Sequence, residues 1–427
     1  MLSSSKKVKY YLTLTLFIFL SCAAKRQEGT VFWHAMGGPL GDALKTIVTW
    51  YSQSNPPITL VNLGNYNTLS QKIMGAVAAN TPPTASQLYE SWASELLSAG
   101  KITPIQNYLS LIDSTKLKNV FDVLIKGNMW GDTLVTFPFN KSVPVFYYNI
   151  DLFEKYGIKR FPQTWDEFRE VAKKLTIDEN GDGKPEIYGT AFTIDAWIFA
   201  TILYQKGGRL LQGDSVLFDS KEGIEALTFL QDLIFKDKCA YLGTGYSHQD
   251  DFANGRVAMI WGTIVSYAFM KDKIKFRLGV APVPIDKYKT VIISGTNVGI
   301  FENVPESYKK NFVNFLNYFL EDSVQAYWSS KTGYIPLTRT AFDHPILKHF
   351  VESVPGLKEA MLQVEYGDYE PRDPVWFTGR RILSEEGIEP ALRGYATPEK
   401  SLKRAADLIR QEIARRKSYQ VYRHSKK

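Results

Sequence analysis

One short run of oxygen-bearing side chains has the spacing of a calcium-binding loop. Asp178, Asn180 and Asp182 occupy the first, third and fifth positions of an EF-hand-like loop, and Gly183 stands at its turn position. The twelfth position, where a bidentate glutamate belongs, is Gly189. The missing carboxylate favours a polar turn, so we predict no metal site, and these three oxygen-bearing residues are the one weak candidate for it.

A single carboxylate stands out as a candidate for catalysis or binding. Glu90 follows the apolar Leu88 and Tyr89 at the end of a buried strand, where a carboxylate needs a partner. A glycoside hydrolase would need two such carboxylates, and the sequence nominates only this one. It also holds no nucleophile elbow, no phosphate loop ending in Gly-Lys-Ser/Thr and no zinc-binding helix motif. We therefore predict that the protein is not an enzyme and has no cofactor.

Short strand-like runs alternate with helical patterns along the chain, which indicates parallel β-α-β units with helices on both faces of a sheet. Such sheets bind ligands outside the carboxyl ends of their strands. The expected strands are 30–33, 58–61, 85–89, 257–261 and 292–300, and the expected helices are 40–53, one from about 67, 165–175, 221–235, 264–271, 305–320 and a C-terminal helix with Leu402, Ala406, Ile409 and Ile413 on one face. Thr164 and Glu167 read as a capping box.

The charge of the chain is concentrated at its two ends. The whole sequence has 51 Lys and Arg and 44 Asp and Glu, a net charge of +7. Residues 1–21 contribute +3 and residues 401–427 contribute +7, so the body, 22–400, has a net charge of −3. A slightly acidic body argues against a nucleic-acid partner. Aromatic residues make up 14% of the chain, and most of them are expected to pack in the core. The alternative is that some of them line a pocket for a polyhydroxylated ligand.

The first segment reads as a targeting signal. Three lysines at positions 6, 7 and 9 precede an apolar run, 10–20, that is too short to span a bilayer. The run ends in Phe19-Leu20-Ser21-Cys22, which resembles a bacterial lipobox. We predict a lipoprotein signal over 1–21, a lipidated Cys22 and a tether over 22–28, in an exported protein held at the membrane. Ordinary cleavage after Ala23 or Ala24 is the alternative.

Several strings, taken in order, resemble the extracellular solute-binding proteins of carbohydrate-type ABC importers, and within that family the members that bind glycerol 3-phosphate. These strings span nearly the whole chain after the signal: Phe32-Trp33-His34-Ala35-Met36, Gly64-Asn65-Tyr66, Leu88-Tyr89-Glu90, Pro138-Phe139-Asn140-Lys141-Ser142, Tyr147-Tyr148-Asn149, Thr164-Trp165, Asn254-Gly255-Arg256-Val257-Ala258-Met259, Gly279-Val280-Ala281-Pro282-Val283-Pro284 and Lys331-Thr332-Gly333-Tyr334-Ile335-Pro336.

The resemblance implies an α/β fold of two lobes, each a mostly parallel sheet flanked by helices, joined by three crossing hinge segments. The crossings fall near 140–146, 283–292 and 334–340. The N-terminal lobe would comprise 29–142 plus 290–334, and the C-terminal lobe 143–289 plus 335–427. The protein would act as a monomer that binds a small molecule in the interlobe cleft and delivers it to ABC permease subunits.

The resemblance also carries the family's binding positions onto this sequence. The implied ligand-binding residues are Tyr66, Glu90, Ser142, Thr263, Gly295, Tyr334 and Arg381, with Trp197 as a further wall of the cleft. Glu90 would accept bonds from two ligand hydroxyls, and Arg381 would pair with phosphate oxygens. Thr263 would open a helix whose N-terminus favours an anion, and Gly295 would let the backbone approach the ligand.

Two departures from the family pattern concern the identity of the ligand. The helix start reads Thr263-Ile264-Val265-Ser266, with fewer hydroxyls than in the family, and the family's paired glycines read Ser294-Gly295. The expected ligand is glycerol 3-phosphate or a glycerophosphodiester. A sugar or oligosaccharide is the alternative within the same family.

Overall fold

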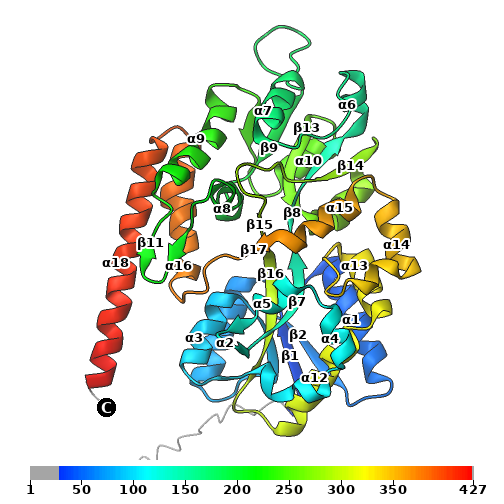
Figure 1. The fold of residues 1–427 in the computed structure, drawn as a ribbon, viewed down its shortest axis with the longest axis vertical. Helices are drawn as coiled ribbons and strands as arrows, with labels where there is room; N and C mark the ends of the chain where they lie inside the picture. The colour runs from blue at the N-terminus through cyan, green and yellow to red at the C-terminus, as the bar shows by residue number, and fades with distance from the viewer. Residues whose placement is uncertain (1–27, 426–427) are drawn as a thin grey trace, which may run out of the picture.

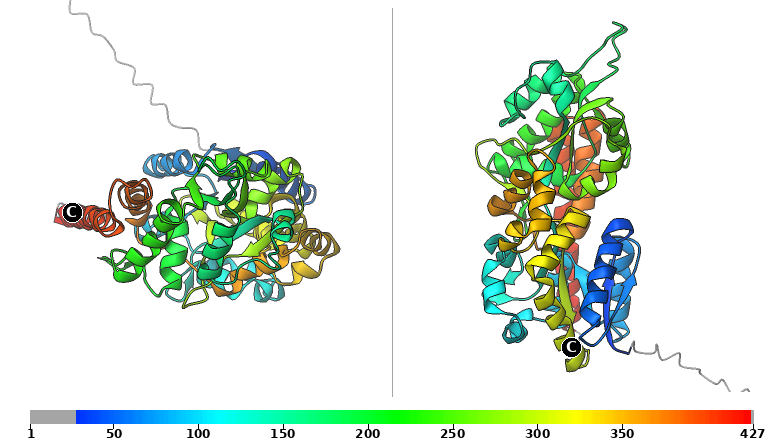
Figure 2. Two further views of the ribbon diagram at one scale, coloured as in Figure 1. Left: turned by 90° about the horizontal axis from the view of Figure 1, so that it is seen from above. Right: turned by 90° about the vertical axis from the view of Figure 1, so that its right-hand side faces the viewer.

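The computed structural model describes residues 28–425, and in this range the chain forms two α/β lobes stacked along the long axis of the molecule (Figure 1). One lobe is built around a six-stranded sheet and the other around a five-stranded sheet. The right-hand view of Figure 2 shows the same two lobes one above the other. The predicted two-lobe α/β architecture is therefore confirmed. The exact lobe boundaries given above remain a prediction.

The sheet of the N-terminal lobe has the strand order β2-β1-β3-β16-β4, with β7 also paired to β16. The strands are β1 (Thr30–His34), β2 (Ile58–Asn62), β3 (Ala85–Leu88), β4 (Ile102–Thr103), β7 (Phe137–Ser142) and β16 (Ser294–Phe301). Strand β1 pairs in parallel with β2 and β3, whereas β16 is antiparallel to all three of its neighbours.

The sheet of the C-terminal lobe has the order β12-β9-β13-β8-β14. Its strands are β8 (Pro144–Asn149), β9 (Tyr188–Phe192), β12 (Ala240–Leu242), β13 (Val257–Thr263) and β14 (Leu278–Pro282). Strand β9 pairs in parallel with β12 and β13, and β8 is antiparallel to β13 and β14. Short two-stranded ladders complete the set: β5 (Met129–Trp130) with β6 (Thr133–Leu134), β10 (Leu211–Gln212) with β11 (Ser215–Val216), and β15 (Val291–Ile292) with β17 (Gly367–Asp368).

One strand in each main sheet runs against all the others, and each of these two strands enters its lobe from the opposite lobe. Strand β8 follows β7 across Val143, and β16 follows β15 across Ile293. A strand that arrives from the other lobe starts at the carboxyl edge of the sheet, so it must run against its neighbours. The starts of β8 and β16 and the end of β7 therefore lie where the two lobes meet, which is where such sheets bind ligands.

Helices cover both sheets (Figure 1). The longer ones are α1 (Gly38–Ser52), α2 (Tyr66–Ala78), α3 (Glu90–Ser98), α7 (Trp165–Lys174), α8 (Ala196–Gln205), α9 (Lys221–Phe235), α12 (Glu306–Phe319), α13 (Asp322–Thr332), α14 (Pro345–Glu352) and α18 (Pro398–Ser425). The shorter ones include α4 (Ser114–Asn119), α5 (Asp122–Lys126), α6 (Ile150–Lys155), α10 (Ser247–Ala253), α11 (Tyr267–Met270), α15 (Leu357–Met361), α16 (Trp376–Ile382), the π-helical turn η6 (Leu383–Ile388) and α17 (Glu389–Leu392). Among residues 28–425, no helix is long and apolar enough to cross a membrane.

Most of the expected elements are confirmed within two residues at each end. Helix α9 has its predicted bounds, and the Ser220 hydroxyl accepts a bond from the Gly223 N–H at its start. In α18 the predicted apolar face is buried on the C-terminal lobe, since Leu402, Ala406 and Ile409 have no exposed surface. This agreement reflects strong local periodicity and capping.

Two local expectations differ from the structure. The helix expected over 264–271 is broken into the 3₁₀ turn η2 (Ile264–Ser266), the four-residue helix α11 and a further 3₁₀ turn η3 (Lys271–Lys273). The phenol of Tyr147 accepts a bond from the Tyr267 N–H and donates to the carbonyls of Thr263 and Ile264, which holds this segment in a tight turn. At the capping box, the Thr164 hydroxyl accepts from the Glu167 N–H as predicted, but the carboxylate accepts from the N–H of Gln163, one residue before the cap.

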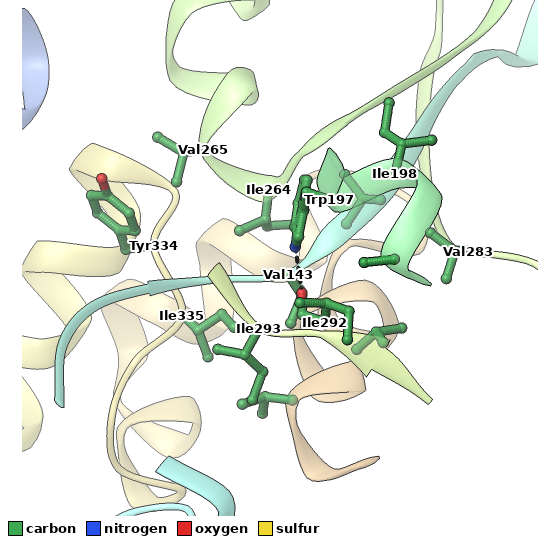
Figure 3. Packing of buried hydrophobic residues seen from close by; sticks show 14 of the residues in the cluster. Val143, Trp197, Ile198, Ile264, Val265, Val283, Ile292, Ile293, Tyr334 and Ile335 are labelled. Carbon is green, nitrogen blue, oxygen red and sulfur yellow. Dashed lines mark hydrogen bonds between the residues drawn. The ribbon is translucent and has the colours of Figure 1, made fainter. Parts of the chain in front are cut away.

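An apolar core fills the region where the three crossing segments meet (Figure 3). Val143, Ile292 and Ile335 come from the first, second and third crossings, and all three are fully buried. The crossings also bond to one another, because the Ile335 N–H donates to the Lys141 carbonyl at 3.0 Å. Trp197 joins this core, and its Nε1 donates to the Ile292 carbonyl at 2.7 Å, the dashed line in Figure 3.

Candidate functional site

A cavity of about 610 Å³ lies between the lobes, beside the crossing segments. Its wall contains seven of the eight residues proposed from the sequence: Tyr66, Glu90, Ser142, Trp197, Thr263, Gly295 and Tyr334. They come from the starts of α2 and α3, the end of β7, the start of α8, the end of β13, the start of β16 and the segment after α13. The volume suits a small organic ligand. The structure shows that these residues share one cavity, while their role in binding remains a proposal.

Glu90 is held by a buried lysine that the sequence reasoning missed. Its Oε1 accepts bonds from Lys141 Nζ at 3.1 Å and from Asn297 Nδ2 at 2.9 Å. The Lys141 side chain has no exposed surface and that of Glu90 is 13% exposed. Burial lowers the pKa of Lys141, and the charge of Glu90 partly offsets that effect. No described residue donates to Glu90 Oε2, which leaves this oxygen for a ligand hydroxyl.

A buried polar network supports the two tyrosines of the cavity. Asn140 Nδ2 donates to the phenol oxygen of Tyr334 at 2.9 Å and to that of Tyr66 at 3.3 Å. The Asn140 Oδ1 atom accepts bonds from Gln87 Nε2 at 2.9 Å and from the Thr296 hydroxyl. Burial raises the pKa of both tyrosines, so they stay neutral phenols. The two phenols also hydrogen-bond to each other, so one phenol proton is used within the pair and only the other is available as a donor toward the cavity.

Ser142 and Thr263 place hydroxyls on opposite sides of the crossing. Ser142 is 3% exposed, and its Oγ has no hydrogen-bond partner among the described residues. A buried hydroxyl without a partner is costly, but this Oγ has almost no accessible surface, so a ligand in the cavity reaches it only if the wall around it shifts. Thr263 ends β13, and only a short turn follows it. The helix start expected here is a 3₁₀ turn with Thr263 as its N-cap, and its first N–H, from Ile264, donates to the Val143 carbonyl at 3.1 Å. An anion seat at Thr263 stays a prediction.

Gly295 is required for a different reason from the one expected. A Cβ at this position would lie 1.9 Å from the backbone oxygen of Asn140 on β7, and its φ of +89° is a conformation that favours glycine. The close approach is therefore between two strands of the protein. The expectation that Gly295 lets the backbone approach the ligand is not needed to explain the residue.

Arg381 does not line the cavity, contrary to expectation. The cavity arginine is the preceding residue, Arg380. The Arg381 side chain is 61% exposed and pairs with Glu385 on the surface of the molecule. Arg380 lines the cavity instead, together with Trp376 and Phe377. The reason is the phase of helix α16, because Arg380 is three and four residues from these aromatic side chains and so shares their face. Arg381 is rotated away by one further residue.

Arg380 is oriented by two carboxylates. Its Nε donates to Glu370 Oε1 at 3.0 Å and its Nη2 donates to Asp195 Oδ1 at 2.8 Å. Burial acts to lower the pKa of Arg380, but the charges of Glu370 and Asp195 outweigh it, and the pKa lies above its ordinary value. The guanidinium is a fixed cation whose remaining N–H groups can meet a ligand.

Aromatic side chains from both lobes complete the wall, which agrees with the alternative interpretation of the aromatic content. They are Tyr66, Tyr89, Trp197, Tyr246, Tyr334, Trp376 and Phe377. The ring of Phe377 on α16 packs edge-on against Trp92 on α3, with centroids 5.2 Å apart. The two lobes therefore touch across one side of the cavity.

The loop that resembles a calcium site is folded on itself. The carboxylate of Asp178 accepts bonds from the Gly181 and Gly183 N–H groups at 2.7 and 2.8 Å, and Asn180 and Asp182 each accept a bond from the backbone N–H two residues later. Within residues 28–425, no group of three His, Cys, Asp or Glu side chains could hold a metal ion.

The residues that sequence reasoning missed are mainly Lys141, Asn140, Asp195, Glu370 and Arg380. Two signals in the sequence point to some of them. Asn140 and Lys141 interrupt an otherwise apolar strand, and buried polar residues in a strand need partners. Trp376 and Arg380 have the spacing of one helix face. No local signal identifies Glu370 or Asp195, because their role depends on contacts between distant segments.

Comparison with known proteins agrees with this geometry. The family profile of the bacterial extracellular solute-binding proteins matches residues 47–353. The sn-glycerol-3-phosphate-binding periplasmic protein UgpB of Escherichia coli O1:K1 is 26% identical over 95% of this chain and 97% of its own length. UgpB of Escherichia coli K12 is 25% identical over 96% and 98%.

Solved structures share the fold. UgpB from Mycobacterium tuberculosis in complex with glycerophosphocholine superposes with a TM-score of 0.80 at 21% identity, covering 92% of this chain and 99% of that one. The cyclic α-maltosyl-1,6-maltose binding protein from Arthrobacter globiformis gives 0.74 at 23% identity, covering 90% and 98%. The profile match spans more than half of the chain, and the relatives match it end to end. The chain therefore belongs to the bacterial extracellular solute-binding proteins, which bind a solute outside the cytoplasm for an ABC importer and are not enzymes.

Proposed function

We propose that this protein captures a glycerophosphodiester, or glycerol 3-phosphate itself, in the interlobe cavity and delivers it to the ABC permease. The observation that carries the proposal is the presence of a fixed guanidinium, Arg380, in the same cavity as the free oxygen of Glu90. Arg380 would pair with phosphate oxygens and Glu90 with glycerol hydroxyls. The end-to-end relatives named for sn-glycerol 3-phosphate support this chemistry.

The charge balance of the cavity favours a diester. Glu90, Asp195 and Glu370 line it with one cation, Arg380, and buried Lys141 adds a second positive charge behind Glu90. The site is therefore net negative by one charge. A phosphomonoester carries between one and two negative charges near neutral pH, whereas a diester carries one. Less repulsion is expected for the diester.

A neutral sugar is the second candidate, and two observations favour it. Both carboxylates that hold Arg380 already neutralise its charge, and the aromatic wall suits the C–H faces of a sugar ring. A sugar would need Glu90, Ser142 and the tyrosines but no phosphate partner. The response of binding to loss of Arg380 separates the two candidates.

The test compares neighbouring arginines by calorimetry with glycerol 3-phosphate, a glycerophosphodiester and maltose. Arg380→Ala should weaken binding of the phosphorylated ligands by about 2–5 kcal/mol, because it removes a charged hydrogen-bonded partner. Arg380→Lys should recover part of the affinity, since an ammonium cannot form two coplanar bonds to phosphate oxygens. Arg381→Ala is the matched control and should bind like the unmodified protein.

The same measurement can reject the phosphate proposal. If Arg380→Lys and Arg380→Ala bind the natural ligand as tightly as Arg381→Ala, while Glu90→Gln loses about 1–3 kcal/mol, the sugar candidate stands. Unfolding curves without ligand check that Arg380→Ala is folded, because the change leaves Glu370 and Asp195 without their cation.

The proposed ligand-binding set is Tyr66, Glu90, Ser142, Trp197, Thr263, Tyr334 and Arg380, with Gly295 shaping the wall.

We also propose that the mature protein is a monomer anchored to the membrane by lipid on Cys22, which lies outside the described residues. The support is the charged start and the short apolar run before this cysteine. Eight peptide steps join Cys22 to Thr30, so the lobes could lie at most roughly 30 Å from the anchor. Cys22→Ala should release the protein from the membrane fraction. Retention of the variant there, with unchanged mobility on a gel, would reject the anchor.

A further inference from the structure

The 367–372 segment runs along one side of the interlobe cavity and leads into helix α16. Its first two residues form β17, which lies between the lobes (Figure 1) and pairs in parallel with β15 of the second crossing. Glu370 and Pro371 line the cavity, whereas their neighbours Tyr369 and Arg372 do not. The segment therefore presents one carboxylate to the cavity between two side chains that make their contacts elsewhere.

Arg372 binds the backbone of the N-terminal lobe. Its Nη2 donates to the Lys126 carbonyl at 2.7 Å, and its Nη1 donates to the Met129 carbonyl. The guanidinium also lies over the ring of Trp130, 5.2 Å from the ring centroid. A planar guanidinium can stack on a ring and form two hydrogen bonds at its edge, which an ammonium cannot do in the same geometry. Arg372 is therefore a specific anchor for the segment.

Tyr369 is the second anchor, and it binds the same stretch of the N-terminal lobe. Its phenol donates to the Val123 carbonyl at 2.8 Å. A Cβ at Gly127 would lie 2.2 Å from the Tyr369 ring, so the ring packs directly on the backbone there. The two anchors thus fix the segment to residues 123–130, and they do so on either side of the part that lines the cavity.

Glu370, between the two anchors, orients the cation of the cavity. Its Oε1 accepts from Arg380 Nε at 3.0 Å, and its Oε2 accepts from Trp376 Nε1 at 2.7 Å, so each oxygen bonds a side chain of α16. The other carboxylate on Arg380, that of Asp195, also caps helix α8 of the C-terminal lobe. The guanidinium is therefore held between a segment anchored to one lobe and a helix of the other.

We infer that Tyr369 and Arg372 are positioning residues for ligand binding. They hold the 367–372 segment against the N-terminal lobe, so that Glu370 keeps the Arg380 guanidinium directed into the cavity. The inference rests on the proposed function, in which Arg380 pairs with phosphate oxygens, and it extends the site to two residues that do not touch the ligand. A planar pair of this kind tolerates little misplacement, so small movements of Glu370 lower the affinity.

The test measures the affinities of glycerol 3-phosphate and glycerophosphoglycerol by calorimetry. Arg372→Ala should weaken binding of both about tenfold, because the cation of the site is loosened but not removed. Arg372→Lys should recover only part of this loss, since a lysine replaces neither the ring stacking nor the second bond. Tyr369→Phe keeps the ring on Gly127 and removes only the bond to Val123, so its loss should be smaller, about threefold.

Arg339→Ala is the matched control. The Arg339 Nη1 donates to the Val120 carbonyl at 3.1 Å, and the guanidinium lies 4.8 Å from the centroid of the Phe121 ring. Arg339 therefore contacts the N-terminal lobe as Arg372 does, but it lies on the third crossing and bonds no residue of the 367–372 segment. Arg339→Ala should bind both ligands like the unmodified protein.

A double variant shows whether Arg372 acts through Arg380. In a protein that already carries Arg380→Ala, the change Arg372→Ala should cause no further loss of affinity, whereas a general loosening of the lobes would add its full effect. Equilibrium dialysis at high protein concentration measures these weaker affinities. Unfolding curves without ligand check that each variant is folded.

The outcomes separate this inference from the proposed function. If Arg372→Ala and Tyr369→Phe bind both ligands like the unmodified protein while Arg380→Ala does not, the positioning role is wrong and the proposed function stands. An equal loss in Arg339→Ala, or a full further loss in the double variant, also overturns the positioning role. If neither ligand binds the unmodified protein, the proposed function is wrong and the positioning role falls with it.

Discussion

At the scale of single residues, Lys141 and Glu90 form an ion pair that allows both charged side chains to be buried. A fully buried ammonium costs several kcal/mol unless it is paired. The carboxylate of Glu90 supplies that pairing through one oxygen and Asn297 fixes the same oxygen, so the second oxygen is aimed by the protein before a ligand arrives. In the proposed function, the pair preorganises Glu90 as a hydroxyl acceptor, which would reduce the entropy cost of binding.

A second buried residue, His34 on β1, makes the stability of the protein depend on pH. Burial lowers the pKa of His34 to about 4, and the Met36 N–H donates to its Nδ1 at 3.2 Å, which requires that nitrogen to be unprotonated. The unfolded chain takes up this proton near pH 6.5. Stability due to neutral His34 is therefore present above pH 6.5 and is lost as the pH falls toward 4, by up to about 3 kcal/mol.

His34→Gln should flatten this acid dependence. The measurement is urea unfolding at pH 7, 5.5 and 4, with the exposed histidine His349, changed to Gln, as the matched control. The unmodified protein and the control should lose stability over this range more steeply than His34→Gln. Equal slopes for all three proteins would show that burial of His34 does not cause the loss.

At the scale of elements, the pairing of β7 with β16 builds the floor of the cavity. Gly295 lies against the Asn140 carbonyl, and Asn140 carries the bonds to Tyr66 and Tyr334. A side chain at Gly295 would force the two strands apart and move these phenols. The position of two predicted ligand contacts thus depends on a glycine that need not touch the ligand.

Gly295→Ala should therefore cost more than an ordinary substitution of a left-handed glycine. The conformational strain of about 1–2 kcal/mol adds to an overpacking cost of about 1–3 kcal/mol. Gly64→Ala is the matched control, since Gly64 has a φ of +82° and open space where a Cβ would lie. Urea unfolding should show a loss of about 2–5 kcal/mol for Gly295→Ala and about 1–2 kcal/mol for Gly64→Ala. Similar losses for both variants would contradict the contact with β7.

At the scale of the whole molecule, the cavity is made by both lobes, so ligand binding is coupled to their relative position. Segment 363–372 of the C-terminal half contacts the N-terminal lobe, where Arg372 donates to the Lys126 carbonyl at 2.7 Å and the Tyr369 phenol donates to the Val123 carbonyl at 2.8 Å. Only a few backbone segments pass between the lobes, and such segments act as hinges in closing proteins.

Ligand binding should stabilise and compact the molecule. At a ligand concentration 100 times the Kd, linkage predicts about 2.7 kcal/mol of added stability. Thermal unfolding should then occur at a higher temperature, and small-angle scattering should give a smaller radius of gyration. Arg380→Ala at the same ligand concentration is the control for binding. Tight binding of a phosphorylated ligand without any compaction would contradict closure of two lobes on it.

The sequence by itself determined the elements and the location of the site. Alternating strand and helix patterns, the Ser220 cap and the apolar face of the C-terminal helix are local features, and they form as their periodicity predicts. Strand ends in α/β sheets meet at one edge, and Glu90 and Thr263 follow predicted strands. Their assignment to the site, and that of Ser142, came from the resemblance to the family.

Only the tertiary structure decided which charges face the ligand. Arg380 and Arg381 are neighbours in sequence, and the choice between them depends on the rotation of α16 against α3, which local propensity does not fix. Lys141 becomes the partner of Glu90 because β16 pairs with both β3 and β7 in the assembled lobe. A second cavity, of about 590 Å³, likewise exists only where α10 and β13 of one lobe face Leu40 on α1 of the other. These are contacts between distant segments, and their energy is gained only when the whole chain has folded.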